Sequence, residues 1–256
     1  MQYGKTPQGG PEGAGLRELT EWWRAVDGRS RSWLILGKGP SFEQRGRYDL
    51  RPYTTLAINH VVREMPVFAT SAVNYEVVGD CGDAIYRNSR YLLMPRYPHS
   101  LPGAGDHLLE TYFETYPVLE RLCREGRLVW YNLSSDRAAP GSPVIENGPF
   151  SVCILFNLLA AMGARRLRTL GIDGGRDYAP SFADLAGGDG GRFKYDYQFQ
   201  DMMATVKRCG LDYAPLAPLT PLQRLRMLAA TPAHRKSVRR WLRTAPWSLG
   251  PSLRHE

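Results

Sequence analysis

Apolar residues fall in short runs along most of the chain, and stretches with helical spacing separate these runs. The runs are rich in apolar and β-branched residues and predict strands at 32–37, 53–59, 67–71, 91–95, 127–133, 165–173 and 211–217. Apolar residues that recur every three or four positions predict helices at 15–28, 74–88, 106–126, 150–164 and 195–210. Pro117 predicts a break in the helix at 106–126.

The alternation of strands and helices predicts an α/β fold. Apolar strands joined through helices form a mostly parallel sheet with helices on both faces, here of about six to seven strands. We therefore expect a single Rossmann-like domain at 15–219, preceded by a flexible leader at 1–14 and followed by a basic helical tail at 220–256. In such folds the ligand lies beyond the carboxyl ends of the strands.

Composition and charge add predictions about partners, cysteine state and location. The chain has 256 residues, is 43% hydrophobic and carries a formal charge of +8. Eight of its 33 Lys and Arg residues, but only one of its 25 acidic residues, lie in 220–256. A cationic tail predicts contact with nucleic acid or an anionic membrane, and the alternative is a solvated helix with a basic bias. The four cysteines are widely spaced, which is typical of reduced thiols. Without an apolar span or signal peptide, we expect a cytoplasmic protein, or one peripheral to a membrane.

A glycine-rich turn follows the first predicted strand at its carboxyl end. Its sequence, "GKGPS" at 37–41, lacks the third glycine of a dinucleotide loop, because Phe42 stands there. Glycine at this edge lets the backbone approach a ligand and leaves N–H groups free for phosphate or carboxylate. Plain turn chemistry is the alternative.

Other polar residues follow later strands at the same predicted edge. Asn59 ends the second strand, Asn132 ends the fifth, and Asp173 ends the sixth. Asn147 and Gly148 precede the helix at 150–164, whose N-terminus favours phosphate. These donors and acceptors suit a ribose, a base or a sugar, although each residue alone is more often a cap or a turn.

Three stretches of the chain resemble glycosyltransferase family 42, the bacterial sialyltransferases. They also resemble the wider Rossmann-like superfamily that includes phage and bacterial proteins. The stretches are "LILGKGPSF" (34–42), "AIN" (57–59) and "NGPFSVCILFNLLAAMGARRLRTLGIDGG" (147–175), in the family's order, and the resemblance covers roughly 32–218. It implies a Rossmann-like fold and transfer of a sugar from a nucleotide-sugar. The residues that it places near the donor are Gly37, Lys38, Gly39, Ser41, Asn59, Asn147, Gly148, Asp173 and, at the leaving phosphate, Tyr178. The sequence departs from the family at Lys38, where the family has Asn, and at Phe193, where the family has its catalytic histidine.

The chemistry of transfer requires a base and a way to neutralise the leaving phosphate. Because the family histidine is missing, we predict Asp196 as the base and Asp177 as the second candidate. Lys38, Arg176 and Tyr178 would neutralise the phosphate without a metal, and no cofactor is expected. The spacing of the histidines matches no metal-ligand pattern.

Three function classes remain open from the sequence. The first is a glycosyltransferase whose acceptor is a saccharide or glycolipid, or a hydroxylated DNA base as in phage DNA modification. The second is a pterin-type diphosphokinase, which would need ATP and Mg²⁺. The third is a nucleic-acid-binding Rossmann protein without catalysis. The sequence fixes neither the donor sugar nor the oligomeric state.

Overall fold

The computed structural model describes residues 15–99, 107–134, 136, 138–148, 150–174, 177–187, 198–218 and 221. The chain forms two compact units, each built from two segments. Unit 1 contains Met1–Arg31 and Thr54–Ala164, and unit 2 contains Ser32–Tyr53 and Arg165–Glu256. The two units are taken in turn.

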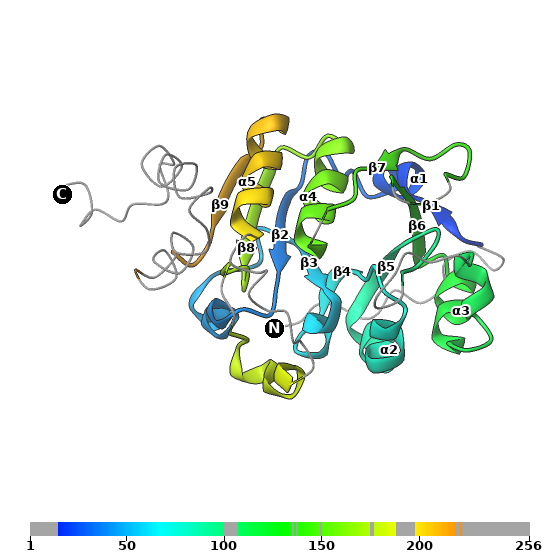
Figure 1. Ribbon diagram of the computed structural model, residues 1–256, viewed down its shortest axis with the longest axis horizontal. Helices are drawn as coiled ribbons and strands as arrows, with labels where there is room; N and C mark the ends of the chain where they lie inside the picture. The colour runs from blue at the N-terminus through cyan, green and yellow to red at the C-terminus, as the bar shows by residue number, and fades with distance from the viewer. Residues whose placement is uncertain are drawn as a thin grey trace. The chain divides into compact units, whose positions relative to one another are not determined.

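Unit 1 is built on parallel strands (Figure 1). Five strands pair in the order β1-β6-β5-β4-β3, and β7 pairs with β6. Their bounds are Arg17–Glu18 (β1), Thr54–Ile58 (β3), Val67–Ser71 (β4), Ser89–Pro95 (β5), Leu128–Leu133 (β6) and Val144–Ile145 (β7). Every residue of β3 is buried, although successive side chains point to opposite faces, so this strand is covered on both sides.

Helices cover the strands of unit 1. They are α1 (Leu19–Ala25), α2 (Glu76–Asn88), α3 (Pro117–Arg124) and α4 (Ser151–Ala161), with short 3₁₀ segments η2 (Asn59–Arg63) and η3 (Leu109–Tyr112). Figure 1 shows α1 and α4 on one side of the strands and α2 and α3 on the other. Residues 152–159 of α4 are all buried, because that helix is apolar on every side.

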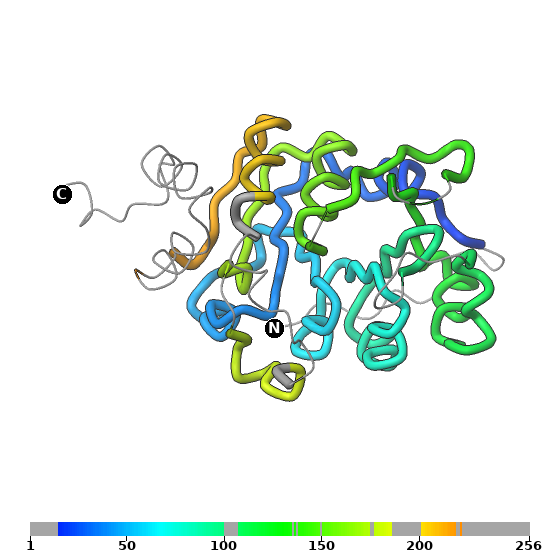
Figure 2. Tube along the Cα trace, viewed as in Figure 1, coloured from blue at the N-terminus to red at the C-terminus, as the bar shows by residue number. Residues whose placement is uncertain are grey.

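Unit 2 contains three parallel strands in the order β2-β8-β9. Their bounds are Ser32–Leu36 (β2), Arg166–Leu170 (β8) and Asp212–Pro215 (β9), and the unit also contains η1 (Pro40–Arg47), η4 (Pro180–Gly187) and α5 (Gln198–Cys209). The path of the chain through these elements can be followed in Figure 2. Leu36 at the end of β2 pairs with Leu170 at the end of β8, so the loops that follow these strands begin side by side. Beyond them Phe42 and Phe182 are both fully buried, with ring centroids 5.4 Å apart.

The fold class predicted from the sequence is confirmed: the chain is a mostly parallel, Rossmann-like α/β protein. The described residues contain nine strands, more than the six or seven expected, because β1 and β7 are two-residue strands. The pattern at 106–126 divides into η3 and α3, and Pro117 is the first residue of α3. The leader at 1–14 lies outside the described residues, as does the tail at 220–256 apart from Pro221, so the domain boundaries stay predictions.

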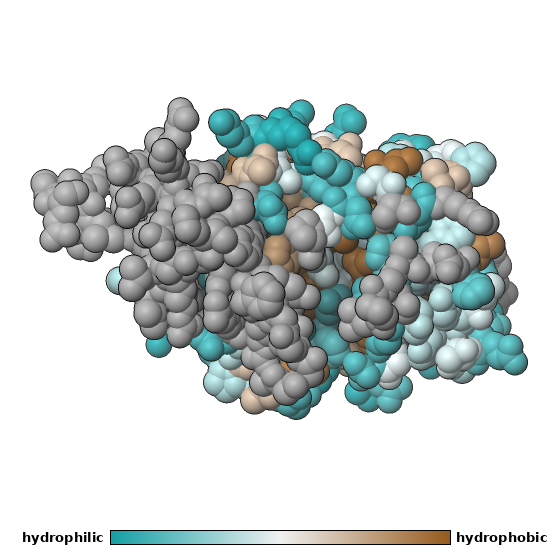
Figure 3. Space-filling view, in the orientation of Figure 1, coloured by the Kyte–Doolittle hydropathy of each residue, from teal (hydrophilic) through white to brown (hydrophobic). Residues whose placement is uncertain are grey.

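The described surface is mainly hydrophilic on the face shown in Figure 3. Among the described large apolar side chains, Leu108 and Val144 are the exposed ones. Within the same residues, no helix is long and apolar enough to cross a membrane. All four cysteines are free thiols, and Cys81 and Cys153 are buried.

Candidate functional site

The predicted glycine turn of unit 2 is joined to the loop that follows β8. Gly37 donates its N–H to the carbonyl of Leu170 at 2.8 Å, and Gly39 donates to Gly171 at 2.7 Å. A Cβ atom at Gly37 would collide with the carbonyl of Gly171, and Gly171 itself has a φ of +76°. The glycines are therefore required because two backbones of the protein approach each other closely.

Asp173 fastens the same turn. One carboxylate oxygen accepts the backbone N–H of Ser41 at 2.7 Å, and the other accepts its hydroxyl at 2.6 Å. The Ser41 hydroxyl in turn accepts the N–H of Gly171 at 2.8 Å. Burial raises the pKa of Asp173, and the two hydrogen bonds from Ser41 oppose this rise. Asp173 is only 5% exposed, and both of its oxygens are used to hold the turn.

These contacts correct one expectation from the sequence. The N–H groups of Gly37, Gly39 and Ser41 are not free for a phosphate, because each already donates to an acceptor in the protein. The prediction failed because the acceptors come from a loop more than 130 positions along the chain, which no local pattern encodes.

Lys38 and Tyr178, both predicted at the leaving phosphate, do come together. The Lys38 ammonium nitrogen lies 4.7 Å from the centroid of the Tyr178 ring, which is a cation–π distance. The backbone supports this pair, because the N–H of Ala179 donates to the carbonyl of Lys38 at 2.7 Å. Neighbouring Asp177 is exposed, whereas Asp196 and Arg176 lie outside the described residues.

A second hydrogen-bonded contact in unit 2 was not expected from the sequence. Glu43 in η1 accepts the hydroxyl of Ser181 at 2.6 Å and its N–H at 3.2 Å. The hydrogen bonds from Ser181 lower the pKa of Glu43, with a smaller contribution from Arg45. Together with the Phe42–Phe182 contact, this bond holds η1 against η4 next to the glycine turn.

In unit 1, Asn59 stands out among the predicted residues. It follows the last residue of β3 and adopts a left-handed conformation, with a φ of +53°. Its side-chain Oδ1 is buried and has no hydrogen-bond partner among the described residues. A left-handed non-glycine residue costs about 1–3 kcal/mol and a buried unsatisfied acceptor a similar amount, so such features concentrate at ligand sites.

Asn147 and Gly148 lie in a constrained loop before α4. The N–H of Asn147 donates to the Ser134 hydroxyl at 2.9 Å, and its Oδ1 accepts the N–H of Gly148 at 2.9 Å. A Cβ atom at Gly148 would lie 2.8 Å from that of Cys153, so glycine is needed for close packing on α4. Helix α4 begins at Ser151, and the two predicted residues therefore precede it by a few positions.

Asn132 has a structural role. Its amide nitrogen donates to the carbonyls of Ala139 and Ser142, and its oxygen accepts the N–H of Ala139. All of these bonds shape the loop between β6 and β7, which leaves Asn132 satisfied within the protein.

The histidines of unit 1 form pairs that the sequence spacing did not indicate. His60 Nε2 lies 3.1 Å from Asp80 Oδ2, and His99 Nε2 lies 3.2 Å from Asp136 Oδ1. No three His, Cys, Asp or Glu side chains within the described residues form a group that could hold a metal ion.

Comparison with known proteins gives one distant likeness in fold. No protein-family model matches the sequence, and the search of curated proteins gave no match. Among solved structures, the chain is similar to one described as "Crystal structure of the sialyltransferase CST-II in complex with trisaccharide acceptor and CMP". The similarity covers 75% of this chain and 83% of that one, with 13% sequence identity and a TM-score of 0.41. At this TM-score the likeness carries no argument about the site.

Proposed function

We propose that the protein is a glycosyltransferase that moves a sugar from a nucleotide-sugar donor to a hydroxyl group of a saccharide. The observation that carries this proposal is Asn59, whose left-handed backbone and unpartnered Oδ1 lie at the carboxyl end of a strand in a parallel sheet. This is the edge at which α/β proteins bind nucleotides. The reaction class rests on the order of the three stretches that resemble the sialyltransferase family.

In this proposal Asn59 binds the base or ribose of the donor. An amide oxygen accepts a hydrogen bond from an amino group or a hydroxyl, both of which a nucleoside carries. The ligand would then satisfy the buried Oδ1, so the free energy lost in the free protein is recovered on binding.

In unit 2, taken by itself, Lys38 and Tyr178 suit the binding of an anionic group such as a phosphate. As the bond from the sugar to the phosphate breaks, negative charge grows on the phosphate, and a fixed ammonium group stabilises that charge. The ring of Tyr178 and the bond from Ala179 to the carbonyl of Lys38 keep this lysine at the glycine turn. Asp173 acts through Ser41, by holding the turn from which Lys38 extends.

A titration of nucleotides and nucleotide-sugars tests the proposal. Calorimetry with CMP-, UDP- and GDP-linked sugars, and separately with ATP and Mg²⁺, should give binding of one class of nucleotide-sugar. Asn59→Ala should weaken that binding by about 1–3 kcal/mol, which is the cost of leaving a polar partner unpaired. Binding of ATP with Mg²⁺ alone would favour a diphosphokinase instead, and unchanged affinity in Asn59→Ala would remove Asn59 from the site.

A further inference from the structure

The imidazole of His99 lies against a buried carboxylate at the ends of two neighbouring strands. His99 follows β5 and Asp136 follows β6, and these strands are paired (Figure 1). His99 Nε2 is 3.2 Å from Asp136 Oδ1. The Asp136 side chain is 1% exposed and that of His99 is 15% exposed, so one member is enclosed while the other still reaches solvent.

The backbone holds His99 in place from both sides. Its N–H donates to the carbonyl of Val73 at 2.9 Å, and its carbonyl accepts the N–H of Tyr75 at 3.2 Å. The N–H of Asp136 donates to the carbonyl of Leu133 at 3.1 Å. These bonds fix the backbone of both residues, and the contact with Asp136 orients the ring.

This contact also decides which ring nitrogen carries the proton. A carboxylate can only accept a hydrogen bond, so Nε2 donates to Asp136 and the neutral ring has its lone pair on Nδ1. Within the described part of the chain, Nδ1 makes no hydrogen bond. The arrangement therefore presents a proton acceptor whose tautomer is fixed by a buried acid, which is the arrangement of a general base.

The second histidine pair of unit 1 differs in one respect. His60 contacts Asp80 at a similar distance, 3.1 Å, but the Asp80 side chain is 62% exposed. Water screens that carboxylate, and such pairs contribute little. The His60–Asp80 pair therefore provides an internal control with the same chemistry in a solvated setting.

We propose that His99 is the general base of the transfer reaction and that Asp136 positions it. This role rests on the proposed function. His99 Nδ1 takes the proton of the acceptor hydroxyl as its oxygen forms a bond to the anomeric carbon of the donor sugar. The bond from that carbon to the phosphate oxygen breaks, its electron pair leaves with the nucleotide, and the imidazolium later returns its proton to water. His99 thus replaces the predicted Asp196 and Asp177.

The test measures transfer and donor binding in the same set of variants. The wild-type chain is assayed for nucleotide release from CMP-, UDP- and GDP-linked sugars with free di- and trisaccharides as acceptors. His99→Ala should lower kcat by about 10²-fold or more. The donor Kd should stay within about twofold, since the base contacts the acceptor. Added imidazole should restore part of the lost rate, a readout that a structural role would not give.

Two further variants separate chemistry from folding. His99→Gln can still donate a hydrogen bond to Asp136 but cannot take a proton at neutral pH, so it should fold and be as slow as His99→Ala. Asp136→Asn should lower kcat by at least about 10-fold, because an amide that donates to Nε2 moves the ring proton to Nδ1. Asp80→Asn, the matched control, should leave kcat within about twofold.

The outcomes distinguish this inference from the proposal on which it rests. A wild-type chain that binds none of the nucleotide-sugars overturns the proposed function, and this role falls with it. A wild-type chain that transfers sugar while His99→Gln transfers at the same rate overturns the role of His99 alone. A folded His99→Ala variant that is slow but gains nothing from imidazole also overturns it.

Discussion

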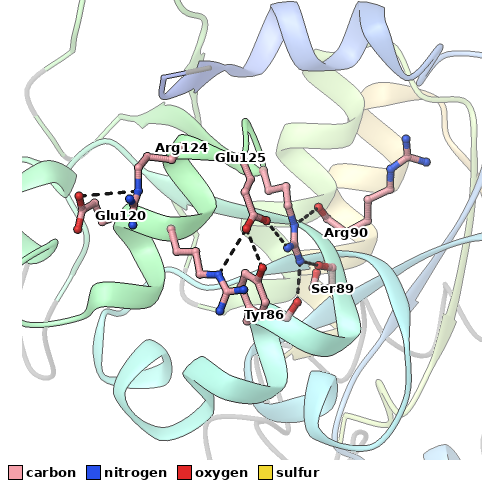
Figure 4. Close-up of polar contacts among 8 residues, drawn as sticks. Tyr86, Ser89, Arg90, Glu120, Arg124 and Glu125 are labelled. Carbon is pink, nitrogen blue, oxygen red and sulfur yellow. Dashed lines mark hydrogen bonds and ion pairs between the residues drawn. The ribbon is translucent and has the colours of Figure 1, made fainter. Parts of the chain in front are cut away.

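The polar groups at the two edges of the sheet in unit 1 differ in how they are hydrogen-bonded. At the amino edge, beside the starts of β5 and β6, Glu125 accepts hydrogen bonds from the Tyr86 hydroxyl and from Arg127, each at 2.7 Å. Arg127 also donates to the carbonyls of Tyr86, Ser89 and Arg90 (Figure 4). At the carboxyl edge, Asn59 and Thr70 each have a buried oxygen that finds no partner within the described part of the chain.

We interpret this difference as a division between residues that stabilise the fold and residues that are available to a ligand. The amino-edge network closes on itself: Arg127 satisfies carbonyls at the end of α2 that the helix cannot satisfy internally. Among the described residues of the carboxyl edge, Asn132 is satisfied, whereas Asn59 and Thr70 keep an unsatisfied oxygen, which in the proposed function a ligand would satisfy. We therefore expect changes at the amino edge to alter folding and changes at the carboxyl edge to alter binding.

The largest expected effect on folding is at Arg127. Arg127→Ala should lower the free energy of unfolding by about 2–3 kcal/mol, because it leaves a part-buried carboxylate and several carbonyls without their donor. Urea denaturation measures this loss, and the nucleotide Kd of the folded protein should not change. Arg124→Ala is the control, since the Arg124 and Glu120 side chains are 71% and 52% exposed, and it should cost no more than about 0.5 kcal/mol. Equal effects of the two variants would contradict the contrast between the edges.

Asp173 in unit 2 differs from Asn59. It is a predicted site residue, but both of its carboxylate oxygens already accept hydrogen bonds from Ser41. Asp173→Ala should lower the free energy of unfolding by about 1–3 kcal/mol, since Ser41 loses both of its acceptors. It should also weaken nucleotide binding, because the turn that carries Lys38 is released. Asp49→Ala, which breaks an exposed pair with Arg51 in the same unit, should do neither. Tight nucleotide binding by a destabilised Asp173→Ala variant would show that the turn takes no part in the site.

A smaller effect is expected from pH at the amino edge. Partial burial raises the pKa of Glu125, but the hydrogen bonds from Tyr86 and Arg127 outweigh it, so the pKa lies below its ordinary value of 4.5. A carboxyl group whose pKa is lowered by folding stabilises the protein above its unfolded pKa, and this contribution is lost as the pH falls through the folded pKa. Stability should therefore decline below about pH 4.5. In Glu125→Gln the slope of stability against pH should be smaller there, and an unchanged slope would rule out this contribution.

The sequence predicts the elements well because their signals are local. The apolar run at 67–71 coincides with β4, and the position of Pro117 divides the helical pattern where the structure does. The sequence does not predict β1 and β7, because two residues are too few to show a periodic pattern. Their place is set by pairing with β6.

The site is predicted less well because its contacts are not local. Ser41 and Asp173 are 132 positions apart and His99 and Asp136 are 37 apart, so their bonds arise from the order of strands and not from spacing. Lys38 and Tyr178 were both predicted at the leaving phosphate, and they lie together because both follow strands that end at one edge of unit 2. Their role at a phosphate stays a prediction. The sequence could not predict that Ser41 would donate two hydrogen bonds to Asp173, or that Asn59 would adopt a left-handed conformation.

One measurement tests the central claim, that the open carboxyl edge exists for a nucleotide. In Asn59→Gly the backbone keeps its left-handed conformation without strain and the unpartnered amide is removed. The free energy of unfolding of the free protein should therefore stay unchanged or rise by up to about 1 kcal/mol, while nucleotide affinity falls by about 1–3 kcal/mol. Denaturation and calorimetry on the same preparation give both values. A variant that loses stability and keeps its affinity would contradict the account, because Asn59 would then be part of the fold and not of the site.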